Sequence, residues 1–374
     1  MSTHRQHVLF VVNSYPPRLG GLENHVASLA AQLVADGHRA SVITLANRPS
    51  ARTVERGVSV TRLRGRWSIA SVISFPAPGT ARRIAHSMRH SGVTAVSTHT
   101  RFFPMSTVGR SVARRLRVPL IHTEHGSDHV RGVSWVIGAA SRLVDLTIGR
   151  AILRSADVVL AVSEQVSAFV HRLAGVDSVL FYNAIDAPAA SDRPPLAANR
   201  FVFVGRIVQG KGWDDLLAAA ALLVAQEPDR RFTVEIMGSG PGMAELRDLV
   251  TRRGLSDVAT VRGQVGPDDV HAGLRGAVMV NPTRLAEGFQ TTLLEALAAG
   301  SQVVTYPAPG VERLRADGAP IRIARARTVE ELAALMAQSL NEPLAAFPPE
   351  QLAHWTWPQR AREYAAILTA LRRR

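Results

Sequence analysis

The 374-residue sequence predicts an α/β protein built from two doubly wound domains. Short apolar runs rich in Val, Ile and Leu alternate with longer segments of helical periodicity, which is typical of parallel strands joined by crossover helices. At about 150 residues per domain, the length also suits two domains. Hydrophobic residues make up 46% of the chain and charged residues 20%, a composition that excludes wholesale disorder.

The first domain is predicted over residues 1–186. Its expected strands lie at residues 8–12, 40–45, 58–63, 93–98, 119–123, 157–162 and 178–182. Its expected helices lie at residues 22–35, 80–90, 104–117, 134–154 and 164–173.

A linker is predicted at residues 187–199, which contain three Pro and no periodic apolar pattern. The alternation restarts in a second domain, residues 200–350. Its expected strands lie at residues 201–204, 232–237, 258–261, 278–281 and 302–305, and its expected helices at residues 214–225, 243–253, 268–274 and 291–299. Residues 351–374 predict a C-terminal helix that packs back across the domains.

Positive charge is concentrated in the first half of the chain. The net charge is +14, and residues 1–186 hold 22 Arg and no Lys against 10 acidic residues, a net charge of +12. This asymmetry indicates an anionic partner there: nucleic acid, anionic lipid or an acidic acceptor. Aromatic residues make up only 5%, and no nucleic-acid module is recognisable, which argues against nucleic acid.

The composition excludes several kinds of chemistry. The sequence has no Cys, so disulfides, thiolate nucleophiles and Cys-ligated metals are excluded. The N-terminal apolar run, residues 8–12, is too short for a signal peptide, and no stretch approaches 18 uncharged apolar residues. We therefore expect a cytoplasmic protein, with surface attachment to a membrane left open.

Glycine-rich turns follow the first strands of both domains. Gly20 and Gly21 precede a helix, where free backbone N–H groups suit a phosphate, although a tight turn explains the same pair. Neither this turn nor the GSGPGM sequence at residues 238–243 completes the G-x-G-x-x-G fingerprint, which argues against a dinucleotide oxidoreductase.

The loop after the first strand of the second domain carries two cations, Arg206 and Lys211. Arg as a fork and Lys as a point charge can converge on one diphosphate. Lys211 is also the only lysine in a chain with 43 Arg. The alternative is structural, with Arg206 paired to an acid and Lys211 solvated.

Two carboxylates, Glu287 and Glu295, lie eight positions apart across a loop-to-helix junction. A carboxylate accepts hydrogen bonds from the adjacent hydroxyls of a vicinal diol, and a helix start offers backbone N–H groups to a sugar hydroxyl or a phosphate. Solvated or capping acids are the alternative explanation.

Taken together, the motifs GGLENHV, ADVVLAVSE, YNAID, VGRIVQGKG, MGSGP and EGFQTTLLEALAAG resemble glycosyltransferase family 4, and they are spread over nearly the whole chain. The resemblance implies the GT-B fold, with two facing Rossmann-like domains and an interdomain cleft. It also implies retaining, metal-independent transfer of a hexose from GDP-mannose or a UDP-hexose, without a cofactor.

The resemblance also assigns roles by position. Glu287 would hold the sugar hydroxyls of the donor and Glu295 its ribose, while Arg206 and Lys211 hold the diphosphate and Gly21 contacts it from the opposite domain. The other implied donor-binding positions are Gly238, Val265, Gly288, Phe289, Gln290 and Thr291. The sequence departs from the family at Gln302, where Pro is usual, and in the loop that follows it.

In the first domain, the family places a histidine near the anomeric carbon, and His125 is the better match, with His122 second. A metal site at His122, His125 and Asp128 is the alternative use of this loop, whereas the resemblance implies no metal.

The basic residues of the first domain are expected to face the acceptor or a membrane. The candidates are Arg62, Arg64, Arg66, Trp67, Arg110, Arg114 and Arg117. The helix expected at residues 104–117 carries Val108, Val112 and Leu116 on one side, which suits either an interfacial amphipathic helix or a core-facing stripe with a solvated Arg face.

The resemblance includes phosphatidylinositol mannosyltransferases. It implies a lipid-linked or polysaccharide acceptor in cell-envelope synthesis, with peripheral attachment to the inner face of the membrane. Two other classes stay open: a non-transferase GT-B protein, such as an epimerase or phosphorylase, and a catalytically silent protein that binds sugars or membranes.

Overall fold

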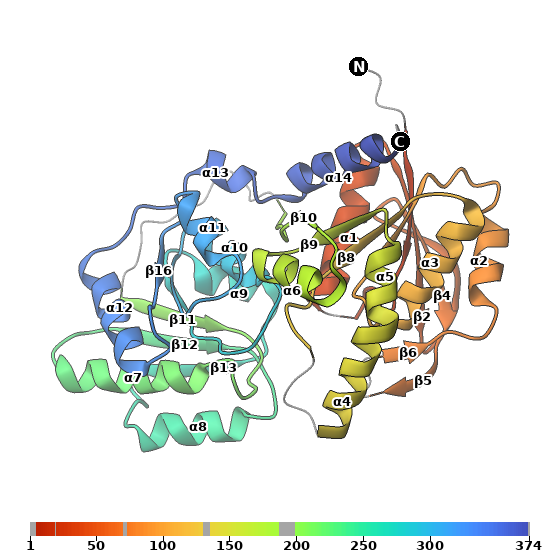
Figure 1. Cartoon of the computed structure of the whole chain (residues 1–374). Helices are drawn as coiled ribbons and strands as arrows, with labels where there is room; N and C mark the ends of the chain where they lie inside the picture. The colour runs from red at the N-terminus through yellow and green to blue at the C-terminus, as the bar shows by residue number, and fades with distance from the viewer. Residues whose placement is uncertain (1–4, 19, 70–72, 130–134, 187–198, 373–374) are drawn as a thin grey trace. The chain divides into compact units, whose positions relative to one another are not determined.

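The computed structural model describes residues 5–18, 20–69, 73–129, 135–186 and 199–372 (Figure 1). The chain divides into two compact units: the first contains Met1–Asp186 and Thr356–Arg374, and the second contains Ala187–Trp355. The predicted linker, residues 187–199, lies outside the described residues except for Asn199.

The first unit is an α/β unit whose elements alternate along most of its length. In chain order they are β1 (His7–Val11), α1 (Gly21–Ala35), β2 (Arg39–Ala46), β3 (Ser50–Glu55), β4 (Val58–Arg64), β5 (Arg66–Ile69), β6 (Ile73–Phe75), α2 (Thr80–Met88), β7 (Ala95–His99), α3 (Pro104–Leu116), β8 (Leu120–Glu124), α4 (Trp135–Val144), the π-helix η1 (Asp145–Gly149), α5 (Arg150–Ser155), β9 (Val158–Ala161), α6 (Glu164–Ala174), β10 (Val179–Leu180) and α14 (Trp357–Arg372).

Within the described residues, these strands form an eight-stranded sheet in the order β10-β9-β8-β7-β1-β2-β4-β3. Its pairs are parallel except for β3, which runs antiparallel to β4. β1 shows why helices are needed on both faces. Val8 and Phe10 pack with α1 and α14, whereas Leu9 and Val11 pack with α2 and α3, because side chains alternate along a strand.

The second unit repeats this construction. Its elements are β11 (Arg200–Val204), α7 (Trp213–Gln226), β12 (Thr233–Met237), α8 (Met243–Arg252), β13 (Ala259–Gly263), α9 (Pro267–Leu274), β14 (Val278–Asn281), α10 (Thr291–Ala298), β15 (Gln302–Thr305), α11 (Val311–Ala316), β16 (Ile321–Ile323), α12 (Val329–Asn341) and α13 (Pro349–Ala353). The strands described here form a six-stranded parallel sheet in the order β13-β12-β11-β14-β15-β16.

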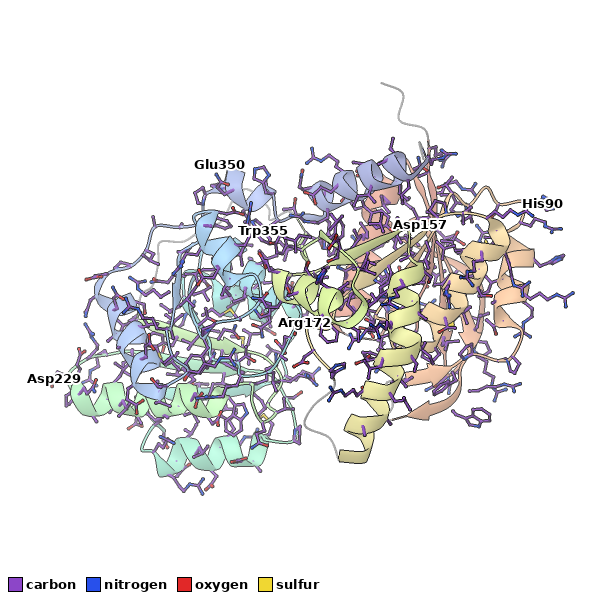
Figure 2. All side chains as sticks on the ribbon, in the orientation of Figure 1. His90, Asp157, Arg172, Asp229, Glu350 and Trp355 are labelled. Carbon is purple, nitrogen blue, oxygen red and sulfur yellow. The ribbon has the colours of Figure 1, made fainter. Side chains whose placement is uncertain are left out.

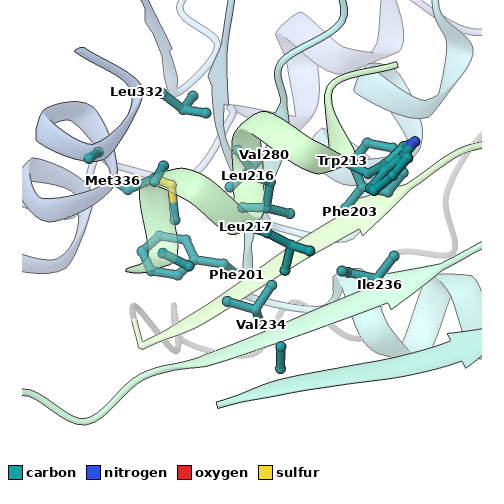
Figure 3. Packing of buried hydrophobic residues seen from close by; sticks show 14 of the residues in the cluster. Phe201, Phe203, Trp213, Leu216, Leu217, Val234, Ile236, Val280, Leu332 and Met336 are labelled. Carbon is teal, nitrogen blue, oxygen red and sulfur yellow. The ribbon is translucent and has the colours of Figure 1, made fainter. Parts of the chain in front are cut away.

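The core of the second unit lies between this sheet and α7, α8 and α12. Phe201 and Phe203 from β11 pack against Leu216 and Leu217 of α7, and Met336 of α12 closes the same cluster (Figure 3). Such a core holds β11 and β14 rigidly, and the loops that follow these strands carry the predicted donor-binding residues.

The sequence missed several elements. The antiparallel β3 and the β5–β6 hairpin lie between the expected strand at 58–63 and its neighbours, and β16, α11 and α12 follow the last strand that we expected. The single helix expected at residues 134–154 is interrupted by η1, whose first residue, Asp145, is buried in an ion pair with Arg101.

Gln302 has a structural role that explains the departure from Pro. It is fully buried at the start of β15, its backbone N–H donates to the Ala277 carbonyl, and its amide oxygen accepts from Arg322. A proline at this position has no N–H to donate.

No helix within the described part of the chain is both long enough and apolar enough to cross a membrane.

Candidate active site

The strand order of the second unit creates a topological switch point between β11 and β14. The chain leaves β11 toward β12 on one side, whereas β14 and β15 lie on the other side. In doubly wound sheets, ligands bind where such loops diverge at the carboxyl ends of the strands. The loop after β11 contains Arg206 and Lys211, and the loop after β14 contains Glu287.

Glycines allow the loops at this switch point to approach one another closely. Gly212 has φ +83°, and a Cβ there would lie 2.0 Å from the Pro282 carbonyl oxygen of the neighbouring loop. Gly238 has φ +145°, and its Cβ would lie 1.8 Å from the Gly205 carbonyl oxygen. Both positions therefore require glycine for packing as well as for conformation.

Lys211 and Glu287 form an ion pair across the switch point. The Lys211 Nζ lies 2.5 Å from the Glu287 Oε1, and the two side chains are only 14% and 21% exposed. Gln290 donates from Nε2 to the other carboxylate oxygen of Glu287, and it accepts from Asn281 Nδ2 at 2.6 Å. Buried neighbours therefore fix the Glu287 carboxylate at the end of β14.

Arg206 is exposed, and its side chain has no ion pair or hydrogen bond within the described part of the chain. This is the reverse of the structural alternative from the sequence, in which Arg206 would be paired and Lys211 solvated. A cation that needs no protein partner is available to an anionic ligand.

The remaining predicted donor-binding residues follow in the same region of the second unit. Phe289 is buried and stacks on Trp355, labelled in Figure 2, with ring centroids 5.7 Å apart. Thr291 begins α10, and Glu295 is exposed one turn further along it. Three predicted residues, Gly238, Val265 and Gly288, are half-buried in loops.

Gly21 is the exposed first residue of α1 in the first unit. A Cβ at Gly21 would meet no atom within 4 Å, so packing does not require glycine there. At Gly20 the added Cβ would meet the flexible carboxylate of Glu23 instead. The open space at Gly21 is compatible with the close approach of a ligand.

His125 follows β8 on a loop held by a buried carboxylate. Glu124 Oε1 accepts the backbone N–H groups of His125 and Gly126 at 3.0 and 2.9 Å, and Arg101 donates to the same oxygen at 3.0 Å. Arg101 also forms two hydrogen bonds to Asp145. The side chains of Arg101, Glu124 and Asp145 are 0% exposed, so this network is rigid and excludes water.

Burial and charge determine the protonation of these groups. Burial alone would raise the pKa of Glu124, but Arg101 and the hydrogen bonds from His122 and Gly126 lower it to about 2. Burial lowers the pKa of His25 to about 4 and holds the pKa values of His99 and His125 well below their usual range. The three imidazoles are therefore neutral near pH 7.

The sequence analysis missed His25, His99, Arg101 and Glu124 as parts of this site. His25 lies on α1, and His99 ends β7, next to β1 in the sheet, so both reach the switch point of the first unit. His99 at the carboxyl end of a strand was the available signal. His122, by contrast, is fully buried between Thr98 and Glu124 and does not belong to the histidine group around His125.

The candidate basic residues of the first unit are only partly available to a partner. Arg62 donates to Glu55 and to the Pro16 carbonyl, so its charge is already used. Arg64, Arg66 and Trp67 are exposed, and Trp67 reaches 83% exposure. Arg114 and Arg117 are exposed as well, whereas Arg110 is half-buried.

The apolar stripe of α3 faces the core. Val112 is fully buried, and Val108 and Leu116 pack against the same cluster. The expectation that this stripe enters a membrane is therefore wrong, and the core-facing alternative is correct. The arginines of α3 remain on its solvated side.

Comparison with known sequences assigns both units. The family model described as Glycosyltransferase Family 4 matches residues 19–187, and the model described as Glycosyl transferases group 1 matches residues 198–342. A D-inositol 3-phosphate glycosyltransferase of Arthrobacter is 27% identical over 339 residues, which cover 80% of this chain and 76% of that protein. A glycogen synthase of Mycobacterium tuberculosis is 26% identical over 366 residues, or 91% and 87% of the two chains.

Solved structures show the same fold. Sucrose-phosphate synthase from Thermosynechococcus elongatus superposes with a TM-score of 0.73 at 20% identity, covering 98% of this chain and 99% of that one. Anabaena HepE in complex with UDP superposes with a TM-score of 0.72 at 18% identity, covering 98% and 100%. The fold is that of the GT-B glycosyltransferases, two Rossmann-like domains in one chain. The chain belongs to glycosyltransferase family 4.

Proposed function

We propose that this protein is a retaining glycosyltransferase that moves a hexose from GDP-mannose or a UDP-hexose to a lipid-linked or polysaccharide acceptor. The observation that carries the donor assignment is the arrangement at the switch point of the second unit. There, Lys211 and Glu287 are paired at 2.5 Å and Arg206 is exposed without a partner.

In this proposal the donor diphosphate recruits both cations. Negative charge develops on the diphosphate as the glycosidic bond breaks, so Arg206 and Lys211 stabilise the transition state more than the ground state. The leaving diphosphate assists deprotonation of the acceptor hydroxyl on the same face, which retains the anomeric configuration. Once Lys211 binds phosphate, Glu287 is free to accept hydrogen bonds from the sugar hydroxyls. This route uses no metal.

His125 suits a role beside the sugar. Its imidazole is neutral and half-buried, and the Glu124 carboxylate fixes its backbone N–H. A neutral imidazole cannot compensate a phosphate charge, but it can form a hydrogen bond with a sugar hydroxyl. The proposal therefore gives His125 the orientation of the sugar and leaves charge stabilisation to Arg206 and Lys211.

An anionic acceptor suits the charge of the first unit. A cavity of about 980 Å³ is lined by α2, α3 and the residue after each, and its lining includes Arg82, Arg83, His86, Arg89, Arg115 and Arg117. One similar protein, from Arabidopsis thaliana, belongs to a phosphatidylinositol N-acetylglucosaminyltransferase and is 26% identical over 83% of this chain and 69% of its own length. We propose that this basic surface holds the protein on the inner face of an anionic membrane, where it meets the acceptor.

Incubation with a panel of GDP- and UDP-sugars tests the proposal. We expect consumption of one donor, and NMR of the first-formed product should show the anomeric configuration of that donor. Inversion would overturn the retaining mechanism. Binding of a nucleotide sugar without turnover, with or without candidate acceptors, would favour the silent binding protein. Epimerised donor, or sugar 1-phosphate formed with inorganic phosphate, would favour the epimerase or phosphorylase.

A further inference from the structure

Three histidines from separate elements of the first unit meet at its switch point. His25 lies on α1, His99 ends β7 and His125 follows β8. One ring nitrogen of each lies within 4.8 Å of a ring nitrogen of both others. His25 and His99 are each 1% exposed, and His125 is half-buried, so the group opens to solvent on the His125 side.

One nitrogen in this group is an unsatisfied lone pair. His25 Nδ1 faces the Asn183 amide oxygen at 2.8 Å. Because an amide oxygen only accepts hydrogen bonds, Nδ1 carries the proton of this ring and Nε2 is bare. The Nε2 atom is buried and has no hydrogen-bond partner. A buried acceptor without a partner is costly, and a bound cation would satisfy it.

The other two rings face each other with the spacing of metal ligands. His99 Nδ1 and His125 Nε2 are 3.1 Å apart. In a tetrahedral zinc site, bonds of about 2.0–2.1 Å place the ligand atoms about 3.3 Å apart. The second nitrogen of His99 faces Ser97 Oγ at 3.3 Å. His25 and His99 thus each have a polar partner on the nitrogen that points away from the group, as metal-bound histidines do.

We propose that His25 Nε2, His99 Nδ1 and His125 Nε2 bind one zinc-like transition-metal ion. The ion takes the place of the proton shared between His99 and His125. Both rings stay neutral, because His99 can carry its proton on Nε2 toward Ser97 and His125 on Nδ1. Three imidazole nitrogens favour Zn²⁺, Co²⁺, Ni²⁺ or Cu²⁺ over Mg²⁺ and Ca²⁺. The fourth position lies on the solvent side, where water completes the tetrahedron.

This site goes beyond the proposed function, in which transfer uses no metal. An ion bound to His125 Nε2 removes that nitrogen from the sugar, so the expected effect of zinc is inhibition that a chelator reverses. Metal binding is measured directly and does not depend on the donor or the acceptor. Failure of this inference is therefore distinguishable from failure of the transferase assignment.

Titration of protein that lacks a polyhistidine tag with Co²⁺ tests the site. We expect one Co²⁺ per chain, with the intense visible absorption of four-coordinate Co²⁺, displaced by Zn²⁺ and insensitive to excess Mg²⁺. His25→Gln and His125→Gln should each weaken binding at least tenfold, since each removes one of three ligands. His171→Gln is the matched control, because His171 lies on α6 in the same unit and is 66% exposed.

The spectrum keeps the test decisive even if a variant of buried His25 does not fold. His125 is half-buried, so His125→Gln is the variant that best preserves folding, which circular dichroism checks. Absence of the four-coordinate spectrum from the wild-type protein would overturn the proposal. So would Co²⁺ binding of equal affinity in folded His125→Gln protein.

Discussion

Lys211 shows how one residue can serve both the ligand-free protein and the donor complex. Its ammonium and the Glu287 carboxylate are largely buried, and each compensates the charge of the other at 2.5 Å. The chain uses Arg at its 43 other basic positions, yet this loop has a lysine. A compact ammonium on a flexible stem can exchange a carboxylate for a diphosphate with little movement of the loop.

Lys211→Ala should lower the rate of sugar transfer about 100-fold, since removal of one preorganised donor to the developing charge typically costs about 2.7–4 kcal/mol. The rate is measured at saturating donor, with thermal unfolding as the check on folding. Arg247→Ala, an exposed change on α8, is the control and should leave the rate unchanged. Turnover like that of the wild type in Lys211→Ala would remove Lys211 from the mechanism.

Gly21 allows a separation of packing from ligand binding. Because a Cβ there meets no atom within 4 Å, Gly21→Ala should leave the unfolding temperature within about 2 °C of the wild type. If the donor phosphates approach this backbone, the same change should raise the donor KM at least tenfold. An unchanged KM would show that Gly21 serves only the turn.

At the scale of elements, the buried network around Arg101 fixes the loop that carries His125. Arg101 follows β7, Glu124 ends β8 and Asp145 begins η1, so one guanidinium joins three segments. The same guanidinium lies 4.4 Å from the centroid of the Phe169 ring on α6. The loop geometry therefore depends on a charge that no solvent reaches.

Arg101→Met should destabilise the first unit by about 3–5 kcal/mol, because it leaves two buried carboxylates without their cation. Urea unfolding monitored by circular dichroism measures the change. Arg172→Met is a matched control: Arg172 is exposed and lies 6.0 Å from the same Phe169 ring, so its loss should cost less than about 1 kcal/mol. Equal losses in the two variants would contradict a special role for the network.

At the scale of the whole molecule, the charge asymmetry separates the two units. Residues 1–186 carry a net charge of +12, whereas the whole chain carries +14. The donor site needs two cations, so most of the excess is available to an acceptor or a membrane. Each basic residue near an anionic surface contributes about 1 kcal/mol of attraction.

Vesicle flotation tests this use of the charge. We expect binding to vesicles that contain anionic lipid, lost at high salt, and weaker binding to zwitterionic vesicles. Replacing Arg82, Arg83 and Arg89 by Gln should reduce binding at least tenfold. Replacing Arg247, Arg252 and Arg253 of the second unit by Gln removes the same charge and should have little effect. Binding that ignores lipid charge would exclude the membrane surface.

The sequence predicted local pattern better than long-range contact. Apolar runs identified β1, β11 and β14, and the loops that follow them carry the predicted donor residues. The edge strand β3 and the hairpin β5–β6 were missed, because their residues are mostly polar or exposed and show no strong apolar run. The pairing of Lys211 with Glu287 and the meeting of His25, His99 and His125 depend on strand order, which no local spacing contains.

Calorimetric titration with GDP, UDP and ADP tests the central claim most directly, namely that the switch-point loops of the second unit bind a nucleotide diphosphate. We predict that one nucleotide binds the wild-type protein and that Lys211→Ala weakens its affinity at least tenfold, about 1.4 kcal/mol, while the fold is unchanged. Failure of all three nucleotides to bind, or equal affinity in the folded Lys211→Ala variant, would contradict the account.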